Sequence, residues 1–191
     1  MKEILLAIMG SGALMFTLKW AKEIWQARRV RLHPTSAAAE FELGIEQLLE
    51  EALSSTNADR VLLLRTTNGG GPIKPGKPIY IEVYREKHTY AVRSVKADFQ
   101  GVEMDTAYAE MIQQLIREQK ISYRTEEMSK GNILHDTYLA DRIQESKIRY
   151  VWEADNFWFL SFSTVTAFNS HDRHRFEVIT RRMRTLFRRK L

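Results

Sequence analysis

Few residues of this chain have the types and spacing that chemistry requires. The loop 68–77 reads NGGGPIKPGK and contains the glycines and lysines of a phosphate-binding loop. In a Walker-type loop, however, Gly-Lys-Ser/Thr leads straight into a helix, so that backbone N–H groups and the lysine meet at the phosphate. Lys77 is followed by Pro78 and a strand pattern. We therefore interpret this segment as a flexible hairpin loop.

Two histidine clusters are the other candidates for chemistry. His171 and His174 have the i, i+3 spacing of a metal-binding pair, but the sequence offers no third ligand, and a solvated first helical turn is the better interpretation. His135 lies beside Asp136 and near Asp141, but no motif places a nucleophile with them. The chain has no cysteine, which excludes thiolate metal sites and cysteine nucleophiles. We expect a non-enzymatic protein with no metal and no cofactor.

The strongest charge pattern is at the C-terminal end. Residues 171–191 contain eight Lys/Arg against two acidic residues. A basic face on the predicted final helix comprises Arg181, Arg182, Arg184, Arg188 and Arg189. This face has three interpretations: it contacts an anionic membrane leaflet, where each basic residue contributes about 1 kcal/mol; it binds nucleic acid; or it is simply solvated. We favour the membrane over nucleic acid because no exposed aromatic residues are interleaved with the arginines.

The hydrophobic periodicity predicts the elements that position these groups. Helices are expected at 36–54, from 105 or 106 to about 118, at 133–146 and from Ser170, as its cap, to the C-terminal end. Strands are expected at 61–67, 78–86, 121–123, 147–154 and 157–165, with 90–95 either a short strand or an irregular edge. Meandering strands with inserted helices predict an α+β fold, with an antiparallel sheet flanked by N- and C-terminal helices.

The N-terminal segment is uncharged from Ile4 to Leu18 and extends through Lys19, whose stem can snorkel, to Ala21. A cleaved signal peptide is disfavoured because apolar residues resume after the small residues at 10–13. A buried core helix would rarely be uncharged on every face. We therefore predict a single transmembrane anchor over 4–21. Basic residues follow this run, so the positive-inside rule places the rest of the chain on the cytoplasmic side of the membrane.

Length and composition allow one domain besides the anchor. The chain has 191 residues, of which 44% are hydrophobic and 28% charged, and its net charge is +5. These values are typical of a globular protein. We predict an anchor and basic juxtamembrane helix at 1–31, a linker at 32–40 and one domain at 41–191.

The order of elements resembles that of the GAF domain family, a relative of PAS. The correspondence consists of LEEALSSTNADRVLLLRTTNGGG for the opening helix and strand, DTAYAEMIQQLIREQKISYRTEEM for the middle helix and its strand, ESKIRYVWEADNFWFLSFSTV for the closing hairpin, and FNSHDRHRFEVITRRMRTLF for the terminal helix. The Asn-Lys-X-Asp-Glu-type motif of the cyclic-nucleotide-binding members is absent, as is the cysteine that attaches bilin in the chromophore-bearing members.

The resemblance implies a sensory or adaptor module that binds a small ligand or a protein partner, with its terminal helices as a candidate homodimer surface. In a GAF-type cavity the lining residues would be Arg65, Tyr84, Tyr138 and Trp152. We thus expect a membrane-anchored, non-enzymatic GAF-like module. The alternative is a nucleic-acid-associated protein that acts through its basic C-terminal helix.

Overall fold

The computed structural model describes residues 19–20, 22, 34–69, 73–74, 76–128 and 133–190. The chain divides into two compact units between Leu43 and Gly44. Among the described residues, no helix is long and apolar enough to cross a membrane. The predicted anchor at 4–21 lies almost entirely outside the described residues.

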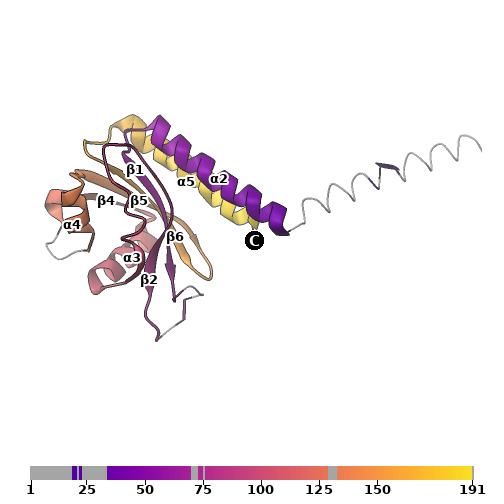
Figure 1. Cartoon of the computed structure of the whole chain (residues 1–191), viewed down its shortest axis with the longest axis horizontal. Helices are drawn as coiled ribbons and strands as arrows, with labels where there is room; N and C mark the ends of the chain where they lie inside the picture. The colour runs from indigo at the N-terminus through magenta and orange to yellow at the C-terminus, as the bar shows by residue number, and fades with distance from the viewer. Residues whose placement is uncertain are drawn as a thin grey trace, which may run out of the picture. The chain divides into compact units, whose positions relative to one another are not determined.

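Six strands form one antiparallel sheet in the described part of the chain (Figure 1). They are β1 (Arg60–Thr67), β2 (Tyr80–His88), β3 (Gln100–Glu103), β4 (Lys120–Arg124), β5 (Glu145–Glu153) and β6 (Phe157–Thr164). Their order across the sheet is β3–β2–β1–β6–β5–β4. Strands β1 and β2 form one hairpin, and β5 and β6 form another. The two hairpins meet at the centre of the sheet, where β1 pairs with β6, and β1 is buried along almost its whole length. Its run of apolar residues is therefore that of a central strand covered on both faces.

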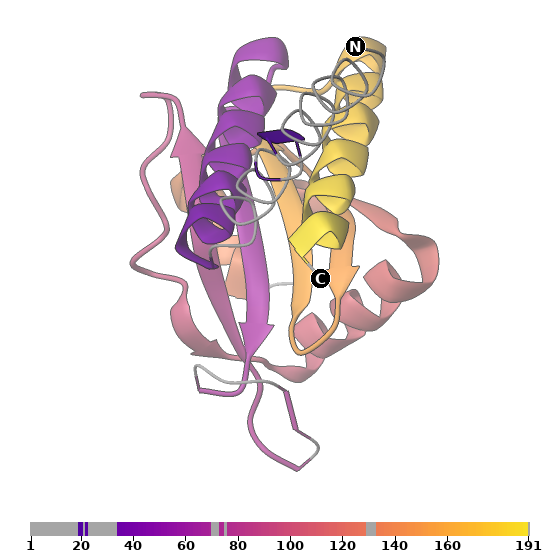
Figure 2. The same ribbon diagram turned by 90° about the vertical axis from the view of Figure 1, so that its right-hand side faces the viewer.

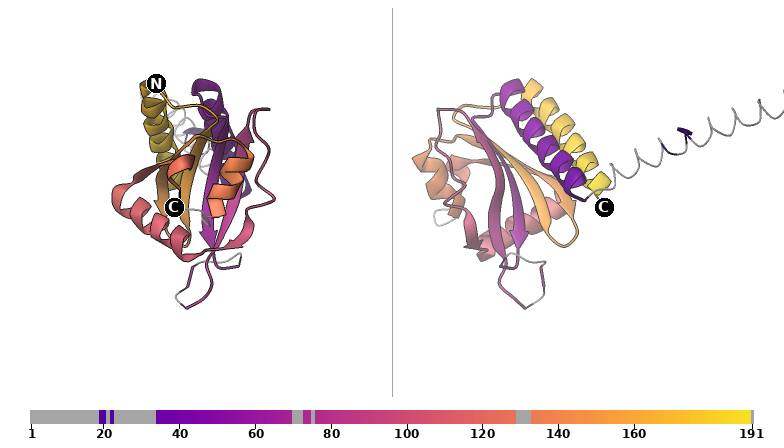
Figure 3. Two further views of the ribbon diagram at one scale, coloured as in Figure 1. Left: turned by 90° about the vertical axis from the view of Figure 1, so that its left-hand side faces the viewer. Right: turned by 45° about the vertical axis from the view of Figure 1, so that its right-hand side comes forward.

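Helices cover both faces of this sheet. Helix α2 (Pro34–Ser55) and helix α5 (Ser170–Lys190) are the long pair, and from Gly44 onward α2 runs beside α5 on one face (Figures 2 and 3). Helix α3 (Thr106–Glu118) and helix α4 (Ile133–Ala140) lie on the opposite face, with a short 3₁₀ turn, η1 (Thr125–Glu127), between them in sequence. We call these the long-helix face and the short-helix face of the sheet. Helix α2 begins at Pro34, a favoured first helical residue, so part of the predicted linker is helical.

The long-helix face is closed by apolar stripes that repeat with helical spacing. Phe162 of β6 stacks on Phe176 of α5, with ring centroids 4.2 Å apart. A Cβ atom at Gly44 would lie only 3.0 Å from the side chain of Leu186, so glycine permits the close approach of α2 to α5 at this point. Burying one such Phe or Leu side chain contributes about 1.5–3 kcal/mol, which makes this packing the main support of both helices.

Two helix starts show how local side chains set the element boundaries. The Asp105 carboxylate accepts from the N–H of Tyr108 at 2.7 Å, as the prediction of a cap at residue 105 or 106 requires. For α5 the cap is Asn169 rather than the predicted Ser170. Asn169 and Asp172 each accept the other's backbone N–H at 2.9 Å, which is a reciprocal capping box.

The structure differs from the prediction at the end of one helix and at one strand. The helix predicted at 133–146 ends at Ala140, because residues from Glu145 onward pair with β6 and Arg142 adopts a left-handed conformation at φ 56°. Residues 90–95 form a turn and irregular chain, which is the second of the two alternatives that the sequence allowed. Strand β3 was missed because QGVE is short and mostly exposed, so no hydrophobic alternation marks it.

Candidate functional site

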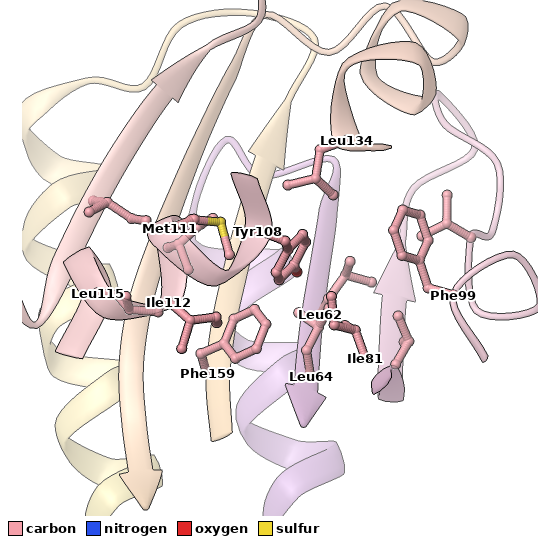
Figure 4. Close-up of a cluster of buried hydrophobic side chains, with 14 of the residues drawn as sticks. Leu62, Leu64, Ile81, Phe99, Tyr108, Met111, Ile112, Leu115, Leu134 and Phe159 are labelled. Atoms are coloured by element: carbon pink, nitrogen blue, oxygen red, sulfur yellow. The ribbon is translucent and has the colours of Figure 1, made fainter. Parts of the chain in front are cut away.

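The space between the sheet and helices α3 and α4 is filled by side chains. Tyr108 of α3 and Leu134 of α4 point toward Leu62 and Phe159 of the sheet (Figure 4). The remaining cavity has a volume of about 20 Å³. That volume is enough for roughly one water molecule. The hydrophobic core of the short-helix face is therefore close-packed.

A buried ion pair lies at the rim of this core. Arg60, only 1% exposed, donates from Nη1 to Asp141 Oδ2 at 2.5 Å. Asp141 Oδ1 also lies 3.2 Å from Nε of Arg93. Nε of Arg60 has no hydrogen-bond partner among the described residues. The pair joins the start of β1 to the end of α4, and it engages the carboxylate that the sequence had offered as an acid–base partner for His135.

A chain of hydroxyl groups fixes Tyr138 on the same face. The Tyr138 hydroxyl donates to Ser146 Oγ at 3.0 Å, and Ser146 Oγ is 3.2 Å from Ser161 Oγ and 3.3 Å from Ser163 Oγ. Tyr138 is 4% exposed. Its polar atom is therefore satisfied within the protein, as buried hydroxyl groups generally are.

The sheet separates Tyr138 from the other three predicted ligand-lining residues, so the four do not line one cavity. Arg65 follows Leu64 on β1 and so points to the opposite, long-helix face. There its Cζ lies 5.2 Å from the Tyr84 ring centroid, and Nε and Nη2 both donate to Glu82 Oε2, at 3.0 and 2.9 Å. Trp152 is on this face as well, as the cross-strand partner of Trp158. Tyr138 alone belongs to the short-helix side.

The predicted basic face of α5 is divided between bound and exposed arginines. Arg182 pairs with Glu51 of α2 at 2.5 Å. Arg184 donates to the Tyr150 carbonyl at 2.9 and 3.1 Å and lies 5.3 Å from the centroid of the Tyr150 ring. The arginines at 181, 188 and 189 are exposed. The acidic residues missing from α5 are thus supplied in part by its neighbour α2, which sequence position alone could not reveal.

No group of three His, Asp or Glu side chains in the described part of the chain could hold a metal ion. His135 lies 3.1 Å from Asp136 at the surface, and His171 and His174 are exposed on the first turn of α5. The histidines of α5 are therefore solvated, whereas the His135 side chain is only 12% exposed and is paired with the exposed Asp136.

A cluster that the sequence analysis missed lies on the outer side of β4 and β5. Beyond the edge of α5, the long-helix face of these two strands is open, and a groove of about 670 Å³ runs between them and the first turns of α5. Its lining includes Lys120, Ser122 and Arg149 from the strands and Arg173 and Glu177 from the helix. We call it the outer groove. The available signal was the basic residues at alternate positions 147 and 149 of a strand, on a face where a helix-covered strand would be apolar.

Two buried basic residues belong to the outer groove. Burial lowers the pKa of Arg149, and Glu177, whose Oε1 lies 3.3 Å from Arg149 Nε, acts in the opposite direction. Lys147 forms an ion pair with Glu145. Burial tends to raise the pKa of Glu145, but hydrogen bonds from Lys147 and from the N–H of Phe168 outweigh it, so the pKa is lowered overall.

Comparison with known proteins gives a fold and no closer relationship. No family model matches the chain. No curated protein matches it in sequence. The structure is similar to the blue-light absorbing form of the PixJ GAF domain of Thermosynechococcus elongatus, with a TM-score of 0.57 and 12% identity over 82% of this chain and 90% of that one. It is also similar to the GAF domain of a two-component sensor histidine kinase from Bacillus halodurans, with a TM-score of 0.55 and 9% identity over 78% of this chain and 93% of that one.

The chain has a GAF-like fold. The six-stranded antiparallel sheet with flanking helices confirms the α+β architecture that the sequence predicted. At 9–12% identity the similarity establishes the fold alone. The functional conclusion must therefore come from the site.

Proposed function

We propose that this protein is a GAF-like adaptor module that recognises a protein partner through its surface and does not hold a small ligand inside the fold. The observation that carries the proposal is the filled core on the short-helix face, where the cavity is about 20 Å³. Sites for small molecules and cofactors generally enclose about 300–1,000 Å³. A ligand of that size would have to displace residues such as Tyr108 and Phe159, which are 2% and 1% exposed.

The polar groups around this core support the same proposal. A ligand site needs a few polar groups that converge on the ligand. Here Tyr138 is committed to Ser146, and Arg60 is committed to Asp141. These interactions tie helix α4 to the sheet. They stabilise the fold, and we therefore propose a non-enzymatic protein.

The Bacillus halodurans neighbour belongs to a sensor histidine kinase, which supports a sensory or adaptor role for the module. We further propose that residues 4–21 tether it to a membrane, with the domain on the cytoplasmic side. The support for the tether is the uncharged run from Ile4 to Leu18 and the basic residues that follow it. Binding of nucleic acid by α5 gains no support, because Arg182 and Arg184 of its basic face have partners within the protein.

A second copy of the chain is the first partner to test, with the terminal helices as the contact surface. Native mass spectrometry of the full-length protein, purified in detergent, measures both the oligomeric state and the presence of a bound small molecule. We expect the mass of the polypeptide, as a monomer or a dimer, with no small molecule bound. A monomer at all concentrations would exclude the homodimer and leave a different protein as the partner.

The matched variant is Thr137→Met, which adds volume at the edge of the remaining cavity. If the wild-type protein carries a small molecule in stoichiometric amount and Thr137→Met loses it, the interior is a ligand site and the proposal is wrong. If a small molecule is bound equally by both proteins, it binds outside this core.

A further inference from the structure

The outer groove exists because the long helices do not cover the whole sheet. Helix α5 and the part of α2 from Gly44 onward pack over the middle of the sheet, and strand β4 forms one edge of the sheet (Figures 1 and 2). The groove of about 670 Å³ lies beside α5 on this uncovered part. Gln114 and Glu118 of α3 line it at the sheet edge, and it is separate from the small cavity between the sheet and α4.

Arg149 lies on the floor of the outer groove and is incompletely paired. The residue is 5% exposed and lines the groove from the middle of β5. Its Nη1 donates to the Ile148 carbonyl at 3.1 Å. Its Nε lies 3.3 Å from Glu177 Oε1, yet it makes no hydrogen bond with any described residue, because the two groups are not aligned. A buried guanidinium with an unused donor is costly unless an anion completes its interactions.

The walls of the groove add donors that point to the same class of ligand. Lys120 and Arg173 are exposed, and no ion pair involves either of them within the described residues. Ser122 adds a hydroxyl group between them on the strand side. Lys147 is already paired with Glu145, and Glu118 and Glu177 are the acidic residues of the lining. Cationic side chains thus outnumber carboxylates in the lining by four to two.

We propose that the outer groove binds a phosphate monoester, with Arg149 at its floor and Lys120 and Arg173 on its walls. A phosphate group presents three acceptor oxygens in different directions and can accept from floor and walls together, whereas a carboxylate presents two in one plane. The groove is far larger than a phosphate ion, and its volume falls within the range of sites for small organic molecules. The phosphate is therefore carried on an organic group.

The first experiment measures binding of glycerol 3-phosphate and of inorganic phosphate to the full-length protein by calorimetry at constant ionic strength. The test variant is Lys120→Gln/Arg173→Gln, which removes two exposed charges and leaves Arg149 in place. The control is Lys77→Gln/Lys96→Gln, which removes the same charge from the exposed side chains near the other edge of the sheet. We expect binding by the wild-type and control proteins, with at least about tenfold weaker binding by the groove variant. Equal binding by all three proteins, or none by the wild type, would overturn the proposal.

A second arm distinguishes the source of the phosphate. Phosphatidylcholine vesicles with and without phosphatidic acid are tested for binding, with glycerol 3-phosphate as a competitor. If glycerol 3-phosphate competes with the vesicles, the groove recognises the phosphate monoester that the soluble ester and phosphatidic acid have in common. Binding to phosphatidic acid that persists in the groove variant shows that another surface is responsible and counts against the groove.

Arg149→Lys is the variant for the floor. It keeps the charge and loses the planar donor set, so we expect weaker binding of inorganic phosphate with little change in the thermal midpoint. Unchanged binding would remove Arg149 from the site. The oligomeric state measured by native mass spectrometry should be the same in all groove variants, so failure of this proposal is distinguishable from failure of the adaptor function.

Discussion

At the scale of single residues, the most demanding feature is the charge of Arg60. Its side chain is 1% exposed and depends on Asp141, whose side chain is 3% exposed. Removing one partner of a buried ion pair leaves the other charge without compensation, whereas removing both is far less damaging. Comparing the single with the double variant therefore shows whether the ion pair stabilises the packing of α4.

We predict that Asp141→Ala lowers the free energy of unfolding by about 3–5 kcal/mol, and that Arg60→Met/Asp141→Ala lowers it by less than the single change does. Urea denaturation followed by circular dichroism measures both. Asp98→Ala is the control, because it breaks an exposed pair with Arg93 and should cost no more than about 1 kcal/mol. A double variant as unstable as the sum of its single changes would show that the two residues act independently.

A second residue-scale prediction concerns alkaline pH. Burial, reinforced by neighbouring Tyr138, raises the pKa of Tyr108 well above its ordinary value. The unfolded chain releases this proton near pH 10, while the folded protein retains it. The contribution of Tyr108 is therefore fully present below about pH 10 and is lost as the pH rises further toward the folded-state pKa.

Tyr108→Phe should accordingly lose less stability than the wild-type protein between about pH 8 and pH 11, measured as the shift in urea midpoint. Tyr90→Phe is the control, since Tyr90 is fully exposed and should leave the alkaline loss unchanged. The same alkaline loss in Tyr108→Phe and in the wild type would contradict the assignment.

At the scale of elements, Asp172 links two parts of the chain that are distant in sequence. Its Oδ2 accepts from the N–H of Asn169 at 2.9 Å, and its Oδ1 accepts from the N–H of Asn57 at 3.0 Å. Asp172 is 1% exposed. The start of α5 is therefore attached to the loop between α2 and β1, and one carboxylate satisfies two backbone donors.

We predict that Asp172→Ala lowers the thermal midpoint by several degrees, because it removes one half of the capping box and leaves the Asn57 N–H without its partner. The expected loss is about 2–4 kcal/mol. Differential scanning calorimetry compares it with Asp136→Ala, which changes an exposed acidic residue in the first turn of α4 and should be nearly neutral. Similar midpoints for the two variants would show that the capping box is dispensable.

The elements themselves could largely be predicted from the sequence, because long periodic segments bury one face. Strands β1, β5 and β6 and helices α3 and α5 lie where alternation and helical spacing placed them. Strand β3 and the end of α4 could not be predicted, since their limits depend on pairing with β2 and β6 and not on local pattern.

The site residues were harder to predict than the elements. Which face Arg65 occupies depends on the register of the whole sheet, and a shift of one residue would reverse it. The partner of Arg182 comes from α2, far away in the sequence. The floor of the outer groove appears only when β4 pairs with β5 and α5 stops short of covering them.

At the scale of the whole molecule, the proposed tether makes a prediction about location. Full-length protein should sediment with membranes, and a chain that begins at residue 32 should not, because the uncharged run at 4–18 is the segment suited to the hydrocarbon core. Fractionation of cell lysates with and without high salt measures this. If the shortened chain remains in the membrane fraction, Arg188→Gln/Arg189→Gln tests whether the exposed arginines of α5 hold it there. Persistence of membrane binding in both would show that neither the segment 4–21 nor these two arginines of α5 is needed for membrane attachment.

The meeting of β1 and β6 at the centre of the sheet also has a consequence for biosynthesis. Arg60 pairs with Ser163 and Arg65 with Trp158, so the central seam joins the early part of the domain to its late part. The hairpins β1–β2 and β5–β6 can each form locally, but the seam has to wait until the ribosome has released nearly the whole chain. Until then, the apolar strand β1 has one unpaired edge. Closing this long-range seam is expected to limit the folding rate, as contact order does in other small domains, and the nascent chain is most prone to aggregation in that interval.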